Sequence, residues 1–251
     1  MSRRYRLEIL KQGLVALITG GASGLGKGTV ETLINHGLKV VIVDLPSSDG
    51  AEIAKYYGEN CIFIPANVKS ETEIAAAFDG LHKHFGKVDI IVNCAGIYRT
   101  GKFYNVMTNQ MQSSEEIKEI FNVNLIGTLN VIRFACKSML ENEKDLTGQR
   151  GVIINVSSVC AFDGAIASLT LPLAGSFGEN GIRFMCIAPG IFDTPMTRPQ
   201  KEKNKSKLVY VPFPKRYGDP LEFGSLVYSI IKNRYLNGEV IRIDGGFHFM
   251  P

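Results

Sequence analysis

The fold of this chain is decided by the stretch LVALITGGASGLG at Leu14–Gly26. It begins with an apolar run rich in β-branched residues, which is typical of a strand buried on both faces. The glycines that follow permit a sharp turn and let a phosphate group approach the backbone amides. A segment of helical period, Leu25–His36, comes next, so a helix N-terminus would face the same phosphate. The stretch therefore predicts the first strand, turn and helix of a nucleotide-binding α/β fold.

The same alternation of apolar runs and helical segments continues along the chain. Besides Leu14–Thr19, we expect strands at Lys39–Asp44, Cys61–Pro65, Val88–Val92, Val152–Val156, Arg183–Ile187 and Val240–Ile243. Further helices are expected at Gly50–Tyr57, Glu71–Phe85, Glu115–Leu140 and Pro220–Lys232, with a capping box of Ser113 and Glu116 before the third. This repetition predicts one α/β domain over residues 1–251: a Rossmann-type, doubly wound parallel sheet of about seven strands with helices on both faces.

Composition excludes several classes of protein. The 251 residues are 45% hydrophobic and 21% charged, which is ordinary for a globular domain and excludes collagen, low-complexity disorder and a disulfide scaffold. The net charge of +4 is too small to indicate nucleic-acid binding. No apolar run approaches the roughly 20 residues that span a bilayer. The five cysteines indicate a reducing compartment and, with the four histidines, form no zinc-ligand spacing, so we expect no metal.

An acidic residue stands where a dinucleotide-binding unit needs one. The second expected strand ends in Asp44, 18 residues beyond Gly26. A carboxylate at about this distance accepts hydrogen bonds from an adenosine ribose, and it repels a 2′-phosphate. The spacing therefore favours NAD over NADP as the cofactor.

Five motifs in order carry a family resemblance. They are TGGASGLG at Thr19–Gly26, NCAG at Asn93–Gly96, Asn124 in a long helical segment, NVSS at Asn155–Ser158 and the pair Pro189–Gly190. Together they resemble the short-chain dehydrogenase/reductase family over nearly the whole chain. Longer stretches, among them VNLIGT, IAPGIFDTPM and LNGEVIRIDG, resemble a mitochondrial branch of that family that acts on 3-hydroxyacyl-CoA thioesters and hydroxysteroids. The resemblance implies an NAD-dependent oxidoreductase that oxidises a secondary alcohol of this kind.

The resemblance also implies roles for individual residues. Ser158 would polarise the substrate oxygen, Asn124 would hold a water in the proton relay, and residues 194–212 would form a flap over the substrate. Asn67 stands where the family usually has Asp. This difference is expected to weaken cofactor binding but not to abolish it, because an amide still forms hydrogen bonds. The expected cofactor-binding residues are Gly20, Ser23, Gly24, Leu25, Gly26, Asp44, Asn67, Val68, Asn93, Cys94, Ala95, Gly96, Pro189, Gly190, Phe192 and Thr194.

One motif of the family is missing. In the family a Tyr exchanges the substrate proton, and a Lys one helical turn later lowers the pKa of that Tyr. Here no tyrosine occurs between Ser158 and Tyr210, and the simplest alignment places a gap of roughly a dozen residues at Gly164–Ala165. Tyr98–Lys102 contains a glycine in a loop, and Tyr228–Lys232 belongs to the last helix, so we expect neither to replace the pair. Tyr98 nevertheless falls at the carboxyl edge of the sheet, where ligands bind in such folds.

Three interpretations of this gap are open. In the first, which we favour, the polypeptide in the cell carries the segment and is an active dehydrogenase. In the second, the chain lacks it and binds NAD without catalysis. In the third, the chain is a non-catalytic scaffold, since the branch that it resembles also takes part in mitochondrial tRNA processing. A mass near 27.6 kDa for the natural protein would exclude the first interpretation.

Partners and location follow mainly from the resemblance. It implies an acyl-CoA or steroid substrate, a homotetramer, tRNA-processing protein partners and a mitochondrial location, with a cytoplasmic location as the alternative. The sequence itself gives no membrane span and no direct nucleic-acid signal. Its first twelve residues include Arg3, Arg4, Arg6 and Lys11, and we favour a solvated basic tail over an organelle-targeting segment.

Overall fold

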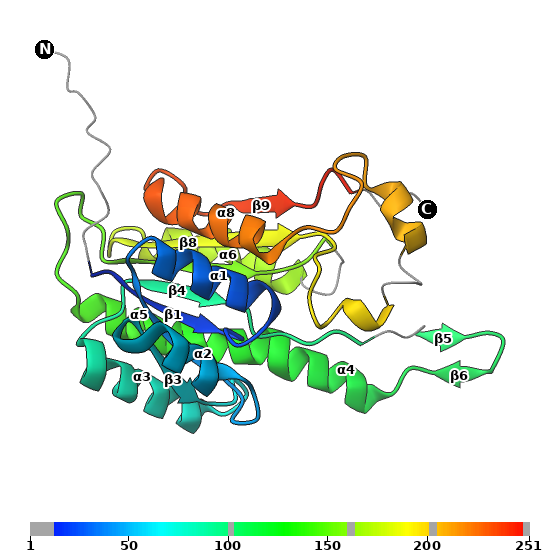
Figure 1. Ribbon diagram of the computed structural model, residues 1–251, viewed down its shortest axis with the longest axis horizontal. Helices are drawn as coiled ribbons and strands as arrows, with labels where there is room; N and C mark the ends of the chain where they lie inside the picture. Colours follow the sequence, from blue (N-terminus) through cyan, green and yellow to red (C-terminus); the bar gives the residue numbers. More distant parts are fainter. Residues whose placement is uncertain (1–12, 100–102, 160–163, 201–204, 248–251) are drawn as a thin grey trace, which may run out of the picture.

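A seven-stranded parallel sheet forms the centre of the computed structural model, which describes residues 13–99, 103–159, 164–200 and 205–247. The strand order is β3-β2-β1-β4-β7-β8-β9 (Figure 1). The chain runs outward from β1 to β3, returns to place β4 on the other side of β1, and then continues outward to β9. The strands are β1 Val15–Thr19, β2 Lys39–Asp44, β3 Cys61–Pro65, β4 Ile90–Asn93, β7 Gly151–Val156, β8 Ile182–Pro189 and β9 Val240–Ile243.

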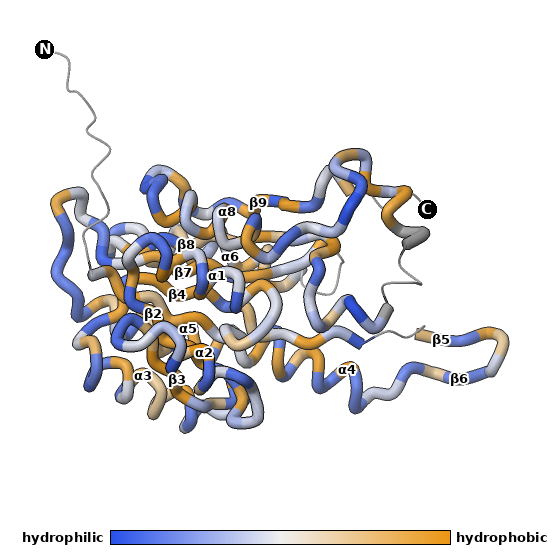
Figure 2. Tube along the Cα trace, viewed as in Figure 1, coloured by the Kyte–Doolittle hydropathy of each residue, from blue (hydrophilic) through white to orange (hydrophobic). Residues whose placement is uncertain are grey.

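Helices cover both faces of the sheet. Because successive strand residues point to opposite faces, two buried clusters form. One cluster joins Ile18 and Ile42 to α1, α2 and α8, and the other joins Leu17 and Val41 to α3, α5 and α6. Figure 2 shows the apolar strands enclosed between these helices. The helices are α1 Gly24–Asn35, α2 Gly50–Tyr57, α3 Glu71–Phe85, α4 Ser114–Ile120, α5 Thr128–Glu141, α6 Gly164–Phe177 and α8 Pro220–Lys232, with 3₁₀ turns at Gly58–Asn60, Arg198–Gln200 and Lys205–Tyr210.

The architecture confirms the predicted single, doubly wound domain. Each predicted strand is present, and the ends differ by one or two residues, as at Ile90–Asn93 against the expected Val88–Val92. Such shifts are ordinary because the apolar pattern marks burial, whereas the ladder hydrogen bonds define the strand.

The long helix expected at Glu115–Leu140 is continuous but not uniform. Between α4 and α5 lies a π-helical stretch, Phe121–Gly127. The apolar period runs on through this stretch, so the sequence pattern does not reveal it. A second unexpected element precedes α4: a short hairpin of β5 Tyr104–Asn105 and β6 Gln110–Met111 extends from the body of the domain (Figure 1).

Helix caps differ in one detail from the expectation. The Ser113 hydroxyl accepts from the amides of Glu115 (3.2 Å) and Glu116 (3.4 Å), so Ser113 is the N-cap of α4. The carboxylate that meets this hydroxyl belongs to Glu115 (2.9 Å) rather than to Glu116, so the expected box is wrong in its partner. A complete capping box is found instead at α8, between Asp219 and Glu222.

Two glycines bring α1 and α8 into close contact. A Cβ atom on Gly224 would lie 2.3 Å from Thr32 Oγ1 and 2.7 Å from the carbonyl oxygen of Gly28. A Cβ on Gly28 would lie 2.5 Å from the carbonyl oxygen of Pro220. The two helices therefore touch through backbone, which holds α1, and the turn before it, firmly on the sheet.

We expect Gly224→Ala to lower the free energy of unfolding by about 1–3 kcal/mol, because the added methyl overpacks a contact made by backbone atoms. Urea denaturation followed by circular dichroism measures the change. Gly175→Ala in α6 is the matched control, since nothing lies within 4 Å of its Cβ position. That variant should be neutral or slightly stabilising, and equal stability of the two variants would contradict the proposed close contact.

Candidate active site

A cavity of about 620 Å³ opens at the carboxyl ends of β1, β2, β3, β4, β7 and β8. Its other wall comes from α4, the π-helical stretch and residues 194–197. This position is the topological switch point, because the connections after β1 and β4 diverge to opposite sides of the sheet. All of the predicted site residues except Asn93 and Phe192 line the cavity.

The glycine-rich turn forms one wall of the cavity with backbone alone. A Cβ on Gly26 would lie 2.1 Å from the Gly20 carbonyl oxygen, and one on Gly20 would lie 2.8 Å from the amide nitrogen of Ala95. Gly20 also has φ of +65°, a conformation that favours glycine. The N-terminus of α1 begins at Gly24, directly after Ser23, and supplies partial positive charge. The cradle therefore suits an anionic pyrophosphate.

Asp44 connects the end of β2 to this turn. Its carboxylate accepts from the amide of Ala22 (3.0 Å) and from that of Leu45 (2.8 Å). The charge is thereby fixed at the cavity wall, beside the glycine-rich turn. Its position suits recognition of the hydroxyls of a ribose attached to the pyrophosphate.

Two of the expected cofactor-binding residues, Asn67 and Val68, follow β3. Val68 is buried, and its carbonyl accepts from the Asn130 side chain (3.0 Å). The Asn67 side-chain oxygen accepts from the amide of Lys69 (3.0 Å), which stabilises the turn locally. Lys69 in turn forms an ion pair with Glu119 of α4 (2.8 Å), and both side chains line the cavity. Sequence reasoning missed this pair, because the two residues lie far apart in the chain and no motif connects them.

At the other end of the cavity, Asn124 holds the segment that follows β4. Its side-chain oxygen accepts from the amide of Ile97 (2.9 Å), and its amide group donates to the carbonyl of Ile97 (3.1 Å). Asn124 lies in the π-helical stretch, a distortion that is frequent at functional sites. Ser158, after β7, lines the same cavity. The two residues expected to be catalytic are therefore brought together by the fold.

Cys94 lines the cavity within the NCAG turn, as predicted. Burial raises the pKa of its thiol to about 12. A thiol with such a pKa stays protonated at neutral pH and is a poor nucleophile. Cys94 can therefore contact a bound group but is not reactive.

Asn93 supports the cavity from below instead of lining it. Its side chain is buried and donates to Asn155 of β7 (2.9 Å), which ties the carboxyl ends of two neighbouring strands together. This geometry does not favour the predicted contact between the Asn93 side chain and the cofactor, because the side chain lies within the sheet.

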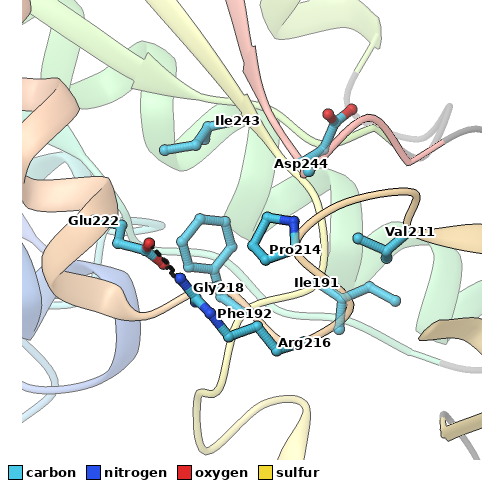
Figure 3. Close-up of a pocket in the computed structure, with 10 residues that line it drawn as sticks. Ile191, Phe192, Val211, Pro214, Arg216, Gly218, Glu222, Ile243 and Asp244 are labelled. Atoms are coloured by element: carbon cyan, nitrogen blue, oxygen red, sulfur yellow. Dashed lines mark hydrogen bonds and ion pairs between the residues drawn. The ribbon is translucent and has the colours of Figure 1, made fainter.

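Phe192 is the second predicted residue outside the cavity. Its ring is buried and meets the ring of Phe223 edge-on, with the centroids 6.2 Å apart. The ring lines a separate cavity of about 150 Å³ behind Ile191 (Figure 3). The Phe192 side chain therefore lies outside the large cavity, although the resemblance places Phe192 among the cofactor-binding residues, because its ring packs against Phe223.

The two Tyr-x-x-x-Lys strings of the sequence lie in different places. Tyr228 stacks on His36 (3.7 Å between centroids), and the ammonium of Lys232 lies 5.5 Å from the Tyr228 ring centroid. Neither residue lines the cavity, which confirms that this pair is structural. Tyr98 does line it, whereas Lys102 falls outside the described residues. The same holds for Cys160–Asp163, which precede the predicted gap, and the described chain resumes at Gly164 with α6.

In the part of the chain that the structure describes, no three His, Cys, Asp or Glu side chains gather as they would around a metal ion. Within the same residues, no helix is both long and apolar enough to cross a bilayer.

A doubly wound parallel sheet with a glycine cradle, a helix N-terminus and an acidic residue at the end of β2 defines a class, the NAD(P)-dependent oxidoreductases. The family described as short chain dehydrogenase matches residues 14–205. The chain belongs to this family, and it is by class an NAD(P)-dependent oxidoreductase.

Individual relatives agree with this assignment. The 3-hydroxyacyl-CoA dehydrogenase type-2 of Bos taurus is 48% identical over 253 residues, covering 96% of this chain and 97% of that protein. The structure of 3-hydroxyacyl-CoA dehydrogenase type-2 from Mycobacterium avium has a TM-score of 0.90 at 29% identity, covering 97% of this chain and 99% of the other. The structure of 3-ketoacyl-(acyl-carrier-protein) reductase from Brucella melitensis, complexed with NADH, has a TM-score of 0.82 at 27% sequence identity. The match covers 94% of this chain and 98% of the other.

The bovine alignment also bears on the missing segment. It spans 253 positions but covers 96% of the 251 residues here, so about a dozen positions of the relative face no residue of this chain. The size of this deficit agrees with the gap predicted after Ser158.

The smaller cavity carries an ion pair with a pH-dependent contribution to stability. Arg216 donates to both carboxylate oxygens of Glu222 (2.7 and 2.9 Å; Figure 3), and the amide of Asp219 donates to one of them (2.8 Å). These contacts, the Arg216 hydrogen bond first, lower the pKa of Glu222 to about 2. In an unfolded chain a Glu ionises near ~4.3.

Because the folded-state pKa is depressed, this stabilisation is present above about pH 4.3 and is lost as the pH falls toward the folded-state value. We therefore expect the urea midpoint of the wild type to fall more steeply between pH 5 and pH 3 than that of Glu222→Gln. Solvent screening keeps the effect small. Equal pH slopes for the two proteins would show that the pair does not contribute.

Proposed function

We propose that this chain binds NAD(H) in the large cavity and oxidises the hydroxyl of 3-hydroxyacyl-CoA thioesters. One observation carries the cofactor proposal: the Asp44 carboxylate is fixed beside the phosphate cradle by the amides of Ala22 and Leu45. The names of the bovine and mycobacterial relatives support the substrate class. A hydroxysteroid is the second substrate class that the cavity is proposed to admit.

The choice of NAD over NADP rests on charge. A carboxylate that accepts hydrogen bonds from both ribose hydroxyls leaves no room for a 2′-phosphate and repels its negative charge. The Asp44 carboxylate is held by two backbone amides, so it does not turn away from such a phosphate without losing them. Binding of NADP would therefore bring its 2′-phosphate against the Asp44 carboxylate and would disturb the two hydrogen bonds that order the turn.

The chain's residues would divide the chemistry between them. A bound nicotinamide supplies the site that accepts a hydride. The Ser158 hydroxyl would donate to the substrate oxygen and orient the carbinol carbon, while Asn124 holds the Ile97 segment at the cavity wall. The backbone of the glycine turn would bind the pyrophosphate. The remaining task is transfer of the hydroxyl proton.

One observation favours a second candidate function. Among the described residues that line the cavity, no tyrosine is followed one helical turn later by a lysine on the same helix. The alternative is therefore an NAD-binding protein without catalysis, acting as a scaffold for tRNA-processing proteins. Binding of NADH without turnover, together with co-purification of such partners, would establish this alternative.

We extend the proposal to a mitochondrial homotetramer. Support for association comes from large apolar side chains exposed on the helices of one face: Phe121 (46%), Ile126 (45%) and Leu171 (68%). Burial of such side chains against a second copy would stabilise an oligomer. The mitochondrial location rests on the sequence resemblance alone, through stretches such as VNLIGT and LNGEVIRIDG.

We expect the wild type to bind NADH at least about tenfold more tightly than NADPH, a difference of about 1.4 kcal/mol. Asp44→Asn removes the charge but keeps an acceptor oxygen, so the difference between the NADH and NADPH affinities should become smaller. Direct NADH and NADPH emission measures both affinities, because the chain has no tryptophan to interfere. Asp49→Asn is the control, since Asp49 is exposed and lies outside the cavity lining. Tighter binding of NADPH by the wild type would contradict the cofactor proposal.

Substrate class is tested by NADH formation. We expect turnover of 3-hydroxybutyryl-CoA in the presence of NAD, and a kcat lowered by about 10²-fold or more in Ser158→Ala, because a donor to the reacting oxygen is removed. NADH affinity should be unchanged in that variant. Turnover of a hydroxysteroid but not of the thioester would identify the second substrate class, and NADH binding without turnover of either would overturn the catalytic proposal.

A further inference from the structure

The reaction proposed above needs a group that takes the substrate hydroxyl proton. Among the cavity-lining residues that the structure describes, Tyr98 supplies the only phenol. The sequence predicts that the Tyr98–Lys102 string does not replace the missing pair, but the position of Tyr98 in the cavity argues for this tyrosine without Lys102. It lies on the segment directly after the NCAG turn, at the carboxyl end of β4. The same end of the cavity holds Ser158 and Asn124.

The backbone that leads into Tyr98 is held in place by two neighbouring segments. The preceding residue, Ile97, makes two hydrogen bonds with the Asn124 side chain (2.9 and 3.1 Å). Two residues earlier in the turn, the amide of Ala95 donates to Thr19 Oγ1 at the end of β1 (3.2 Å). Since Asn124 is itself on the cavity wall, it positions the Tyr98 segment against the reacting end of the site.

The neighbouring Arg99 adds positive charge at this position. Its guanidinium donates to the carbonyl of Tyr98 (3.3 Å), and Arg99 also lines the cavity. A phenol-bearing residue and a cationic residue therefore stand next to each other on this loop, and both line the cavity.

Exposure of Tyr98 provides a route for the proton. Tyr98 is 45% exposed and lines an open cavity, so water reaches it there. A group that accepts a proton in each turnover must release it again, and contact with water allows this. Tyr98 therefore combines access to the substrate with access to bulk solvent.

We propose that Tyr98 is the catalytic residue that exchanges the substrate proton in this chain, a role that rests on the function proposed above. In the oxidation, the O–H bond of the substrate breaks and its proton passes to the Tyr98 phenolate oxygen. The carbinol C–H bond breaks with its electron pair going to the nicotinamide, and the carbonyl double bond forms. The proton then leaves Tyr98 for water, and in reduction the phenol donates it back.

Tyr98→Phe tests this role, with Tyr104→Phe as the matched control. Tyr104 is 46% exposed, so it resembles Tyr98 in exposure, but it lies on β5 outside the cavity lining. We expect Tyr98→Phe to lower kcat for 3-hydroxybutyryl-CoA oxidation by about 10²-fold or more, the usual range for a general acid or base. KM and NADH affinity should stay within about twofold of the wild type, because the substrate remains bound elsewhere. Tyr104→Phe should be fully active.

A second readout is independent of turnover. Tetranitromethane nitrates accessible tyrosines, and peptide mass spectrometry locates the product. We expect acetoacetyl-CoA with NADH to protect Tyr98 and to leave Tyr104 as reactive as before. Equal nitration of Tyr98 with and without these ligands would overturn the proposal.

The outcomes separate the two proposals. Full activity of Tyr98→Phe, with an active wild type, would overturn the role of Tyr98 and leave the dehydrogenase function intact. A wild type that binds NADH but turns over no substrate would overturn both. Loss of activity in Tyr98→Phe with normal NADH affinity, together with protection from nitration, is the result that supports Tyr98.

Discussion

The structure depends on one steric constraint, the absence of side chains where the glycine-rich turn folds against itself and against the next strand. A Cβ on Gly26 would meet the Gly20 carbonyl oxygen at 2.1 Å, and one on Gly20 would meet the Ala95 amide at 2.8 Å. These two approaches bring β1, α1 and the end of β4 to one point. The phosphate cradle and the reacting end of the cavity are therefore parts of one backbone arrangement.

The order of the strands in the sheet decides on which side of the cavity each functional residue lies. The switch between β1 and β4 opens the cavity, with Asp44 on the β2 side and Ser158 on the β7 side. Asn124 joins the π-helical stretch to the segment after β4 through two hydrogen bonds with Ile97. The Asn124 amide, together with the bond from the Ala95 amide to Thr19 Oγ1, thus holds the loop that carries Tyr98.

The strands and most helices could be predicted because each depends on its own apolar period and on the glycines and caps at its ends. The π-helical stretch at Phe121–Gly127 could not, since its apolar residues continue the helical pattern while its hydrogen bonds depend on neighbouring segments. The same reason applies to Phe192: its position after Pro189-Gly190 predicts a place in the large cavity, but its ring packs against Phe223 of α8. Contacts between segments distant in the chain, such as that of Lys69 with Glu119, cannot be predicted from the sequence of either segment alone.

By itself the sequence determined the class of fold, the cofactor end of the site and the absence of the Tyr-x-x-x-Lys segment, because these are encoded in local order and spacing. Only the tertiary structure decided which side chains share the cavity. It separates Tyr228 and Lys232, packed on α1 through His36, from Tyr98, which lines the cavity. The physical reason is that a motif specifies residue types along the chain, whereas a reaction requires groups that meet in space. They meet here at the carboxyl ends of the adjacent parallel strands β1 and β4, where the connections after these strands diverge.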